Sequence, residues 1–274
     1  MKQSQLKKQA KHLLKHLPGK YQLFAIPIAL HIILLFIQLH QNYLVEQGIS
    51  ISTFASIFPI LLNILASFFL LSAAFTILKV IRQQKKQVTF SDSSLVFNNP
   101  LFRKLIILLS LKFLLIFLWS LILMLGLGLL GIGYLFYSIN LKTGSPIMAP
   151  ISVMILGGLV ALIGLIIAIN RQLAYSMSEN LLFDQIEKGE DPAAIDIIDH
   201  SISLMKGYKW KFFLFQFSFI GWFLLAILSF GILYIYLLPY VTTSILYFYD
   251  FIKDSKDKSL LDDKKHNLKN DYLS

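Results

Sequence analysis

Six long apolar runs divide this chain, and the segments between them alternate between strongly basic and nearly uncharged. About 20 apolar residues are needed for a helix to cross the hydrocarbon core of a bilayer. With the runs taken as spans, 23 of the 25 Lys and Arg residues fall on one side; Lys112 lies inside a span and Lys142 lies opposite. Cytoplasmic loops carry an excess of Lys and Arg, so both termini are predicted to be cytoplasmic.

The predicted fold class is all-α, a polytopic helical membrane protein with six transmembrane helices and short interfacial amphipathic helices. A multi-pass location in the cell membrane follows. The membrane domain is expected over 21–251, with spans at about 22–43, 54–78, 105–133, 147–170, 212–229 and 232–249. Outside the spans we expect a basic amphipathic helix at 1–20 lying on the inner leaflet, a cytoplasmic insert at 171–211, and a charged cytoplasmic tail without fixed structure at 252–274.

The composition excludes several classes of protein. A net charge of +10 suggests nucleic acid in a soluble protein, but here the one-sided pattern accounts for it, and no nucleic-acid partner is expected. The expected partners are anionic lipids of the inner leaflet. The chain has no Cys, which excludes disulfides, thiolate chemistry and Cys-based metal sites. The Lys-rich start does not resemble a cleavable signal, so the first span is expected to stay in the mature protein.

The apolar run from Leu105 to Ile139 is longer than one span requires. As a helix it would measure about 52 Å against a hydrocarbon core of about 30 Å, so it tilts, projects outward or breaks at its glycines. A hairpin here would place the later basic segments outside, and we reject it. Gly126, Gly128 and Gly131 match G-x-G-x-x-G, but no strand precedes them and no carboxylate follows before Glu179, so a nucleotide site is not expected.

Small residues recur on two spans at spacings that favour close helix packing. Gly157, Ala161, Gly164 and Ala168 form two small-xxx-small pairs, and Gly221 offers a further small contact. In lipid, helix association depends on packing, so small residues let backbones approach. We predict an intramolecular helix seam for the first four residues, with homodimerisation as the alternative.

A short helix is predicted at 192–206, between the cytoplasmic insert and the fifth span. Its apolar face is expected to comprise Ala194, Ile195, Ile198, Ile202 and Met205. Asp196, Asp199 and His200 fall on the other face, where we interpret them as solvated rather than catalytic. The pattern leaves open whether the apolar face lies on lipid or on a partner.

A few polar residues interrupt the spans and are candidates for a path or a ligand site. They are His31, Asn63 and Gln216, together with Pro239, which frees a backbone carbonyl. His31 either hydrogen-bonds to Asn63 or to a backbone carbonyl, or serves as a ligand or proton relay. Lys112 lies close enough to the cytoplasmic side to extend its ammonium group to the head groups.

The sequence contains no recognisable catalytic constellation. It has no H-E-x-x-H, G-x-S-x-G or P-loop, and no Asp or Glu lies inside the six predicted spans. We therefore expect no enzymatic activity, no cofactor and no metal site.

Several motifs in the C-terminal part and one at the start resemble a known family. They are Leu6-Lys7-Lys8-Gln9-Ala10-Lys11, Tyr175-Ser176-Met177, Ser203-Leu204-Met205-Lys206-Gly207, Lys209-Trp210-Lys211, Leu214 to Trp222, Leu238-Pro239-Tyr240 and Phe248-Tyr249. Over 171–251 the chain resembles the Gram-positive integral membrane proteins called domain of unknown function 975. The resemblance implies a six-span bacterial membrane protein and no particular reaction.

Basic and aromatic residues gather at the entry to the fifth span. Lys206, Lys209, Trp210 and Lys211 suit phospholipid head groups and would set the depth of the helix. The leading hypothesis is a non-enzymatic scaffold that interacts with lipid or peptide, or an accessory subunit of an envelope complex with a protein partner in the membrane. The alternative is a small-solute transporter or permease whose path is lined by His31, Asn63, Gln216 and Pro239.

Overall fold

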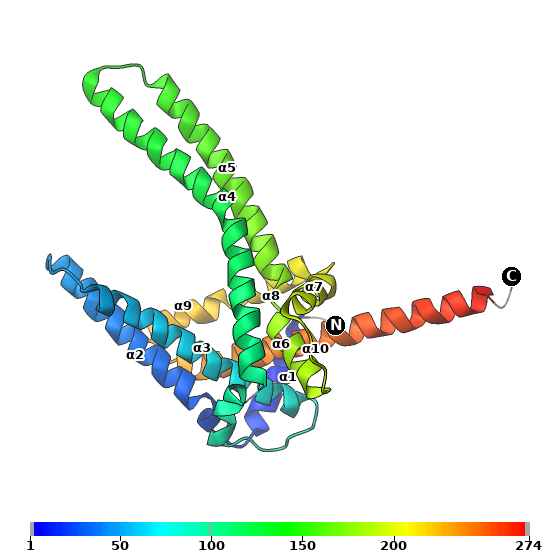
Figure 1. Ribbon diagram of the computed structural model, residues 1–274. Coiled ribbons are helices and arrows are strands. Elements are labelled where there is room, and N and C mark those ends of the chain that lie inside the picture. The colour runs from blue at the N-terminus through cyan, green and yellow to red at the C-terminus, as the bar shows by residue number, and fades with distance from the viewer. Residues whose placement is uncertain (1–2, 99, 272–274) are drawn as a thin grey trace. The chain divides into compact units, whose positions relative to one another are not determined.

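The computed structural model describes residues 3–98 and 100–271, and within them it contains helices and no strand (Figure 1). Six helical segments are long and apolar enough to cross a membrane, which confirms the all-α, six-span prediction. They are Lys20–Glu46, Thr53–Ile81, Leu101–Thr143, Met148–Glu187, Lys209–Leu228 and Tyr234–Lys258.

The chain divides into two compact units. Unit 1 comprises the residues up to Phe102 and those from Lys211 on, and unit 2 comprises Arg103–Trp210. The helices, in chain order, are α1 (Gln3–His16), α2 (Lys20–Glu46), α3 (Thr53–Ile81), the 3-10 helix η1 (Phe90–Phe97), α4 (Leu101–Thr143), α5 (Met148–Ala174), α6 (Ser178–Glu187), α7 (Ala194–Met205), α8 (Lys209–Phe217), α9 (Ile220–Leu228) and α10 (Tyr234–Asp271).

Helix α1 packs against α10 within unit 1. Its residues Leu6, Ala10 and Leu14 are buried, as is Leu17 just after the helix, with at most 6% of each exposed. The sequence predicts that this face lies on the inner leaflet; the structure instead covers it with protein. Helical periodicity identifies the apolar face of a helix but not the surface that covers it.

The fifth predicted span is two helices, not one. α8 ends at Phe217 and α9 begins at Ile220. The Ser218 hydroxyl donates to the Phe215 carbonyl oxygen at 2.5 Å, and the Phe219 N–H bonds three residues back to Gln216. Serine hydroxyls compete with the helical ladder in this way and bend helices, which accounts for the break.

The C-terminal tail also departs from expectation. The sequence predicts no fixed structure from residue 252, whereas α10 continues to Asp271; residues 272–274 lie outside the described part. No Gly or Pro follows Pro239 in this helix, and its last 20 residues are dominated by Lys, Asp and Leu. No residue type in this stretch therefore interrupts a helix sterically.

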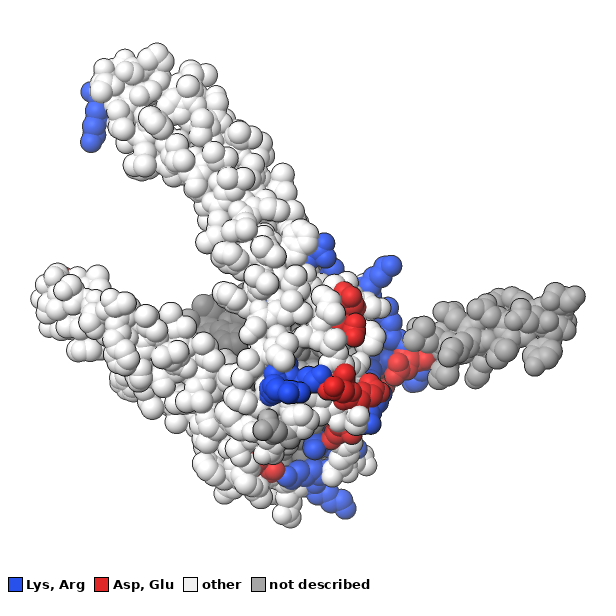
Figure 2. Space-filling model, viewed as in Figure 1, with Lys and Arg blue, Asp and Glu red and all other residues white. Residues whose placement is uncertain are grey.

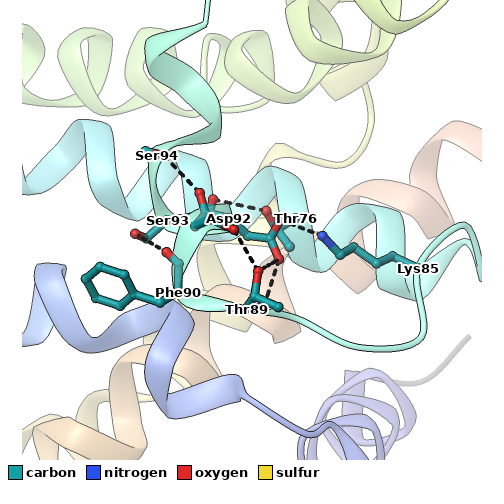
Figure 3. Close-up of polar contacts among 8 residues, drawn as sticks. Thr76, Lys85, Thr89, Phe90, Asp92, Ser93 and Ser94 are labelled. Carbon is teal, nitrogen blue, oxygen red and sulfur yellow. Dashed lines mark hydrogen bonds and ion pairs between the residues drawn. The ribbon is translucent and has the colours of Figure 1, made fainter.

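The loop after α3 is fixed by a polar network around Asp92 (Figure 3). The Asp92 carboxylate accepts bonds from Lys85 Nζ at 2.5 Å and from the N–H of Thr89 at 2.8 Å. The Ser72 hydroxyl on α3 accepts the Val96 N–H at 3.0 Å, and Thr76 donates to the Asp92 carbonyl. These bonds hold η1 against the cytoplasmic end predicted for α3.

In unit 2, α4 is a single unbroken helix, and Figure 1 shows it beside α5 as a long hairpin. The sequence left three possibilities for the apolar run from Leu105 to Ile139: that it tilts, projects outward or breaks at its glycines. The unbroken helix shows that the third is wrong. The first turn of α4, from Leu101 to Lys104, precedes the predicted span. There Lys104 pairs with Asp191 at 2.5 Å and bonds the Pro192 carbonyl at 3.0 Å. Figure 2 shows no charge on the visible face of the hairpin between its base and the last turn of α4, which carries Lys142.

Helix α7 packs on α6 and α5, not on lipid alone. Its buried residues are Ile197, Ile198, Ser201, Leu204 and Met205, whereas Ile195 is 49% exposed. The buried face of α7 is therefore rotated about the helix axis relative to the predicted apolar face. The rotation brings the Ser201 hydroxyl to the inside. This hydroxyl donates to the Ala174 carbonyl at 2.8 Å and accepts the Met177 N–H at 3.3 Å.

Candidate functional site

A cavity of about 330 Å³ lies between α1, the start of α2 and α10, all within unit 1. We call it the basic pocket. Its lining residues are Lys11, Leu14, Lys15, Lys20, Tyr21, Tyr236 and Pro239. Three of the seven carry ammonium groups, none carries a carboxylate, and the rest are apolar or aromatic.

The helix-breaking pair Pro18-Gly19 positions the third lysine. Gly19 adopts φ 80°, a left-handed conformation that suits glycine, and the chain turns from α1 into α2. Lys20 thereby reaches back to the end of α1, where its Nζ donates to the Leu14 carbonyl oxygen at 2.5 Å. The last carbonyls of a helix lack partners within the helix, so a cation there is stabilised.

Aromatic side chains hold the first lysine. Lys11 Nζ lies 5.4 Å from the ring centroids of both Trp222 and Tyr240. One turn earlier, Lys7 Nζ lies 3.9 Å from the Phe219 ring centroid and donates to the Ser218 carbonyl at 3.1 Å. Burial lowers the pKa of Lys7, and the neighbouring charge of Lys11 lowers it further. The break between α8 and α9 thus supplies the carbonyl on which α1 is anchored.

The chemistry of the basic pocket favours an anionic, amphiphilic ligand. Three ammonium groups can hold a phosphate or carboxylate, and Leu14, Tyr236 and Pro239 offer an apolar wall beside them. Sequence reasoning missed this site. The sequence feature that could have indicated the basic pocket is the pair Lys11 and Lys15, which lie four residues apart on one side of the helix and are followed by Lys20 just past the turn.

The chain matches the family described as protein of unknown function, DUF975, over residues 1–256. It belongs to this family. The prediction from the motifs is confirmed, and the match covers far more than the 171–251 segment that carried most of the resemblance. No curated protein and no solved structure matches the chain.

The residues predicted to line a path in this DUF975 protein do not gather in a described cavity. Asn63 and Gln216 are exposed on outward helix faces, and only Pro239 lines the basic pocket. His31 Nδ1 lies 2.6 Å from the Pro27 carbonyl oxygen, and the centroid of its ring lies 5.4 Å from that of Tyr234, with the ring planes tilted by 46°. Of the partners expected for His31, the structure shows the backbone carbonyl rather than Asn63.

The predicted head-group residues of this DUF975 protein have diverse contacts. Lys206 is exposed and Trp210 is 67% exposed. Lys209 donates to the Asn170 side-chain oxygen at 2.9 Å, and the Lys211 carbonyl accepts a bond from Gln3 at 3.1 Å. Lys206, Trp210 and Lys211 are therefore exposed, and Lys209 is partly exposed.

Lys112 pairs with a carboxylate that the sequence analysis did not predict. Its Nζ lies 2.6 Å from Glu179 Oε1 at the start of α6, and the two side chains are 17% and 14% exposed. Ser178 donates to the other carboxylate oxygen at 3.1 Å. A carboxylate partner stabilises an ammonium group that has little access to water, and sequence spacing alone could not reveal it.

The small residues predicted as a helix seam lie where α4 and α5 of this DUF975 protein meet. A Cβ on Gly157 would lie 2.6 Å from the Leu130 nitrogen, and one on Gly164 or Gly126 would overlap the backbone of the opposite helix. Ala161 is buried, Ala168 is partly exposed, and Gly221 has open space around it. Across the described residues, no group of three or more potential metal ligands occurs.

Proposed function

We propose that this protein is a non-enzymatic membrane protein that binds an anionic phospholipid of the inner leaflet through the basic pocket. The convergence of Lys11, Lys15 and Lys20 on one cavity carries the proposal. A head-group phosphate would lie among these ammonium groups. Each Lys near an anionic membrane surface contributes roughly 1 kcal/mol of attraction.

The shape of the basic pocket supports a lipid rather than a small polar anion. About 330 Å³ accommodates a head group and part of the glycerol backbone, not two acyl chains. The wall formed by Leu14, Tyr236 and Pro239 continues into helices whose outer faces are apolar. The acyl chains would lie along those faces, in the bilayer.

The lining also supports a binding role over catalysis. It contains no carboxylate and no imidazole that could act as a general base, and its tyrosines lie beside cations rather than beside a base. The lysines hold anions as point charges, and the aromatic rings fix two of the cations in place.

The test is native mass spectrometry of the full chain in neutral detergent, with added phosphatidylglycerol or phosphatidylcholine. Wild-type protein is expected to retain phosphatidylglycerol in preference. The triple variant Lys11→Gln, Lys15→Gln, Lys20→Gln should bind it about 100-fold more weakly, since three charges correspond to about 3 kcal/mol.

A matched control removes three charges elsewhere. Lys8, Lys188 and Lys258 are exposed and lie outside the basic pocket, so their triple Gln variant should retain the lipid. Lys20 also caps α1, and the double variant Lys11→Gln, Lys15→Gln therefore tests the site without disturbing that bond. Equal losses in the pocket and control variants, or no preference for the anionic lipid, would refute the proposal.

A further inference from the structure

A second cavity, of about 410 Å³, borders a different side of α1 in unit 1. We call it the histidine pocket. Its polar lining residues are His12, His16, Gln83, Lys85, Lys86 and Tyr247, which come from α1, the loop after α3 and α10. At 3.6 residues per turn, His12 points about 100° away from Lys11, and His16 points about 100° away from Lys15. The two cavities therefore border different sides of α1.

The lining of the histidine pocket is rich in hydrogen-bond donors. Two ammonium groups, two imidazoles, an amide and a phenol surround it, and no lining residue carries a carboxylate. The rings of His12 and His16 lie 4.8 Å apart, so both face the same region. Such a set suits an anion with several oxygens, and the volume is typical of ligand sites.

The loop network described above holds one of these cations in place. Lys85 bonds Asp92 at 2.5 Å, and Asp92 is itself held by Thr89 (Figure 3). Hydrogen bonds from Lys85 and Thr89 outweigh the effect of burial, which by itself raises the pKa of Asp92, and leave that pKa below its ordinary value. Asp92 therefore stays ionised, and Lys85 keeps two N–H donors for a ligand.

Backbone strain at Gln83 provides an independent indication of function. Gln83 has φ 59°, and its N–H bonds the Val80 carbonyl at 3.0 Å just after α3 ends. Glycine is the usual residue at such a helix end, because a side chain disfavours the left-handed conformation. Strained non-glycine residues cluster at functional sites, and here the strained residue lines the cavity.

We propose that the histidine pocket binds a phosphoryl group, held by His12, His16 and Lys86 and by the Gln83 amide. The phosphoryl group belongs either to a soluble phosphate compound or to a lipid head group; the chemistry of recognition is the same. This site is separate from the basic pocket and does not depend on its function.

The first arm of the test is isothermal titration calorimetry of the full chain in neutral detergent with inorganic pyrophosphate. Wild-type protein should bind it saturably, and the variant His12→Gln, His16→Gln, Lys86→Gln should bind at least 10-fold more weakly. The basic-pocket variant Lys11→Gln, Lys15→Gln should bind like wild type, which separates this proposal from the preceding one.

The second arm uses nanodiscs that contain phosphatidylglycerol, with the same variants. Loss of retained lipid in the histidine-pocket variant, without pyrophosphate binding in the first arm, assigns the phosphoryl group to a lipid. Loss of pyrophosphate binding assigns it to a soluble compound. If the variant matches wild type in both arms, the proposal is overturned.

Gln83→Gly separates a binding role from a structural one. Glycine relieves the strain, so the thermal midpoint should stay equal or rise, while pyrophosphate or lipid binding falls about 3-fold or more. A more stable protein with unchanged binding would remove Gln83 from the site, and a general loss of stability would contradict the strain argument.

Discussion

In unit 2, α4 and α5 approach until backbone meets backbone at Gly126, Gly157 and Gly164, whereas in unit 1 two cavities remain beside α1. The seam of unit 2 is apolar, and the partly buried Lys112 on α4 has a carboxylate partner. The flanks of α1 instead carry cations that share their cavities with no carboxylate. The difference is that unit 2 packs closely between α4 and α5, whereas unit 1 leaves space beside α1, where we propose that ligands bind.

The largest effect is expected from a substitution that breaks the ion pair between Lys112 and Glu179 in unit 2. Lys112→Met leaves the Glu179 carboxylate without its cation and should lower the free energy of unfolding by about 3–5 kcal/mol. The double variant Lys112→Met, Glu179→Met should recover most of that loss. Thermal unfolding of the single and double variants in detergent measures both, and additive losses would show that the pair is not coupled.

The next effect tests the tightness of the seam. Gly126→Ala places a methyl group against the Ala161 backbone and should cost about 1–3 kcal/mol of stability. On the same helix, Gly128 has nothing within 4 Å, so Gly128→Ala should stabilise by up to about 1 kcal/mol. Gly126→Ala should lower the thermal midpoint of unfolding and Gly128→Ala should raise it. Identical shifts would mean that α4 and α5 do not pack this closely.

The anchoring of α1 can be weakened without touching either cavity. Lys7→Gln removes the cation above the Phe219 ring and the bond to the Ser218 carbonyl, at an expected cost of about 1–2 kcal/mol. Lys8 is exposed, and Lys8→Gln should be neutral. Limited proteolysis between α1 and α2 would report the loosened helix, and equal cleavage of both variants would argue against this anchor.

The smallest effect is a pH dependence in the loop that borders the histidine pocket. Because the pKa of Asp92 is lowered in the folded state, its contribution is complete above the ordinary carboxyl value near 3.8 and is lost as the pH falls through the lower folded value. Solvent screens Lys85, so we expect at most about 1 kcal/mol. Asp92→Asn should lower the thermal midpoint at about pH 6 and not at about pH 3; an exposed control, Asp199→Asn, should change neither.

The sequence predicted elements whose signal is local and missed those set by distant contacts. The six apolar runs follow from composition and were predicted correctly. The partner of Lys112 lies 67 positions away and could not be read from spacing. The basic pocket was missed for the same reason, because α10 closes a cavity that α1 begins.

The anchor of α1 also has a consequence in time. Lys7 bonds Ser218, which lies 211 positions later, so α1 is made well before α8 and reaches its final place only after α8 has emerged. At about 5–20 residues per second, synthesis of the intervening chain takes about 10 to 40 s. During that interval the apolar face of α1 has the membrane surface available as a temporary cover. The helix can thus lie on the membrane surface at first and pack inside unit 1 later, and its docking reports that α8 has been made.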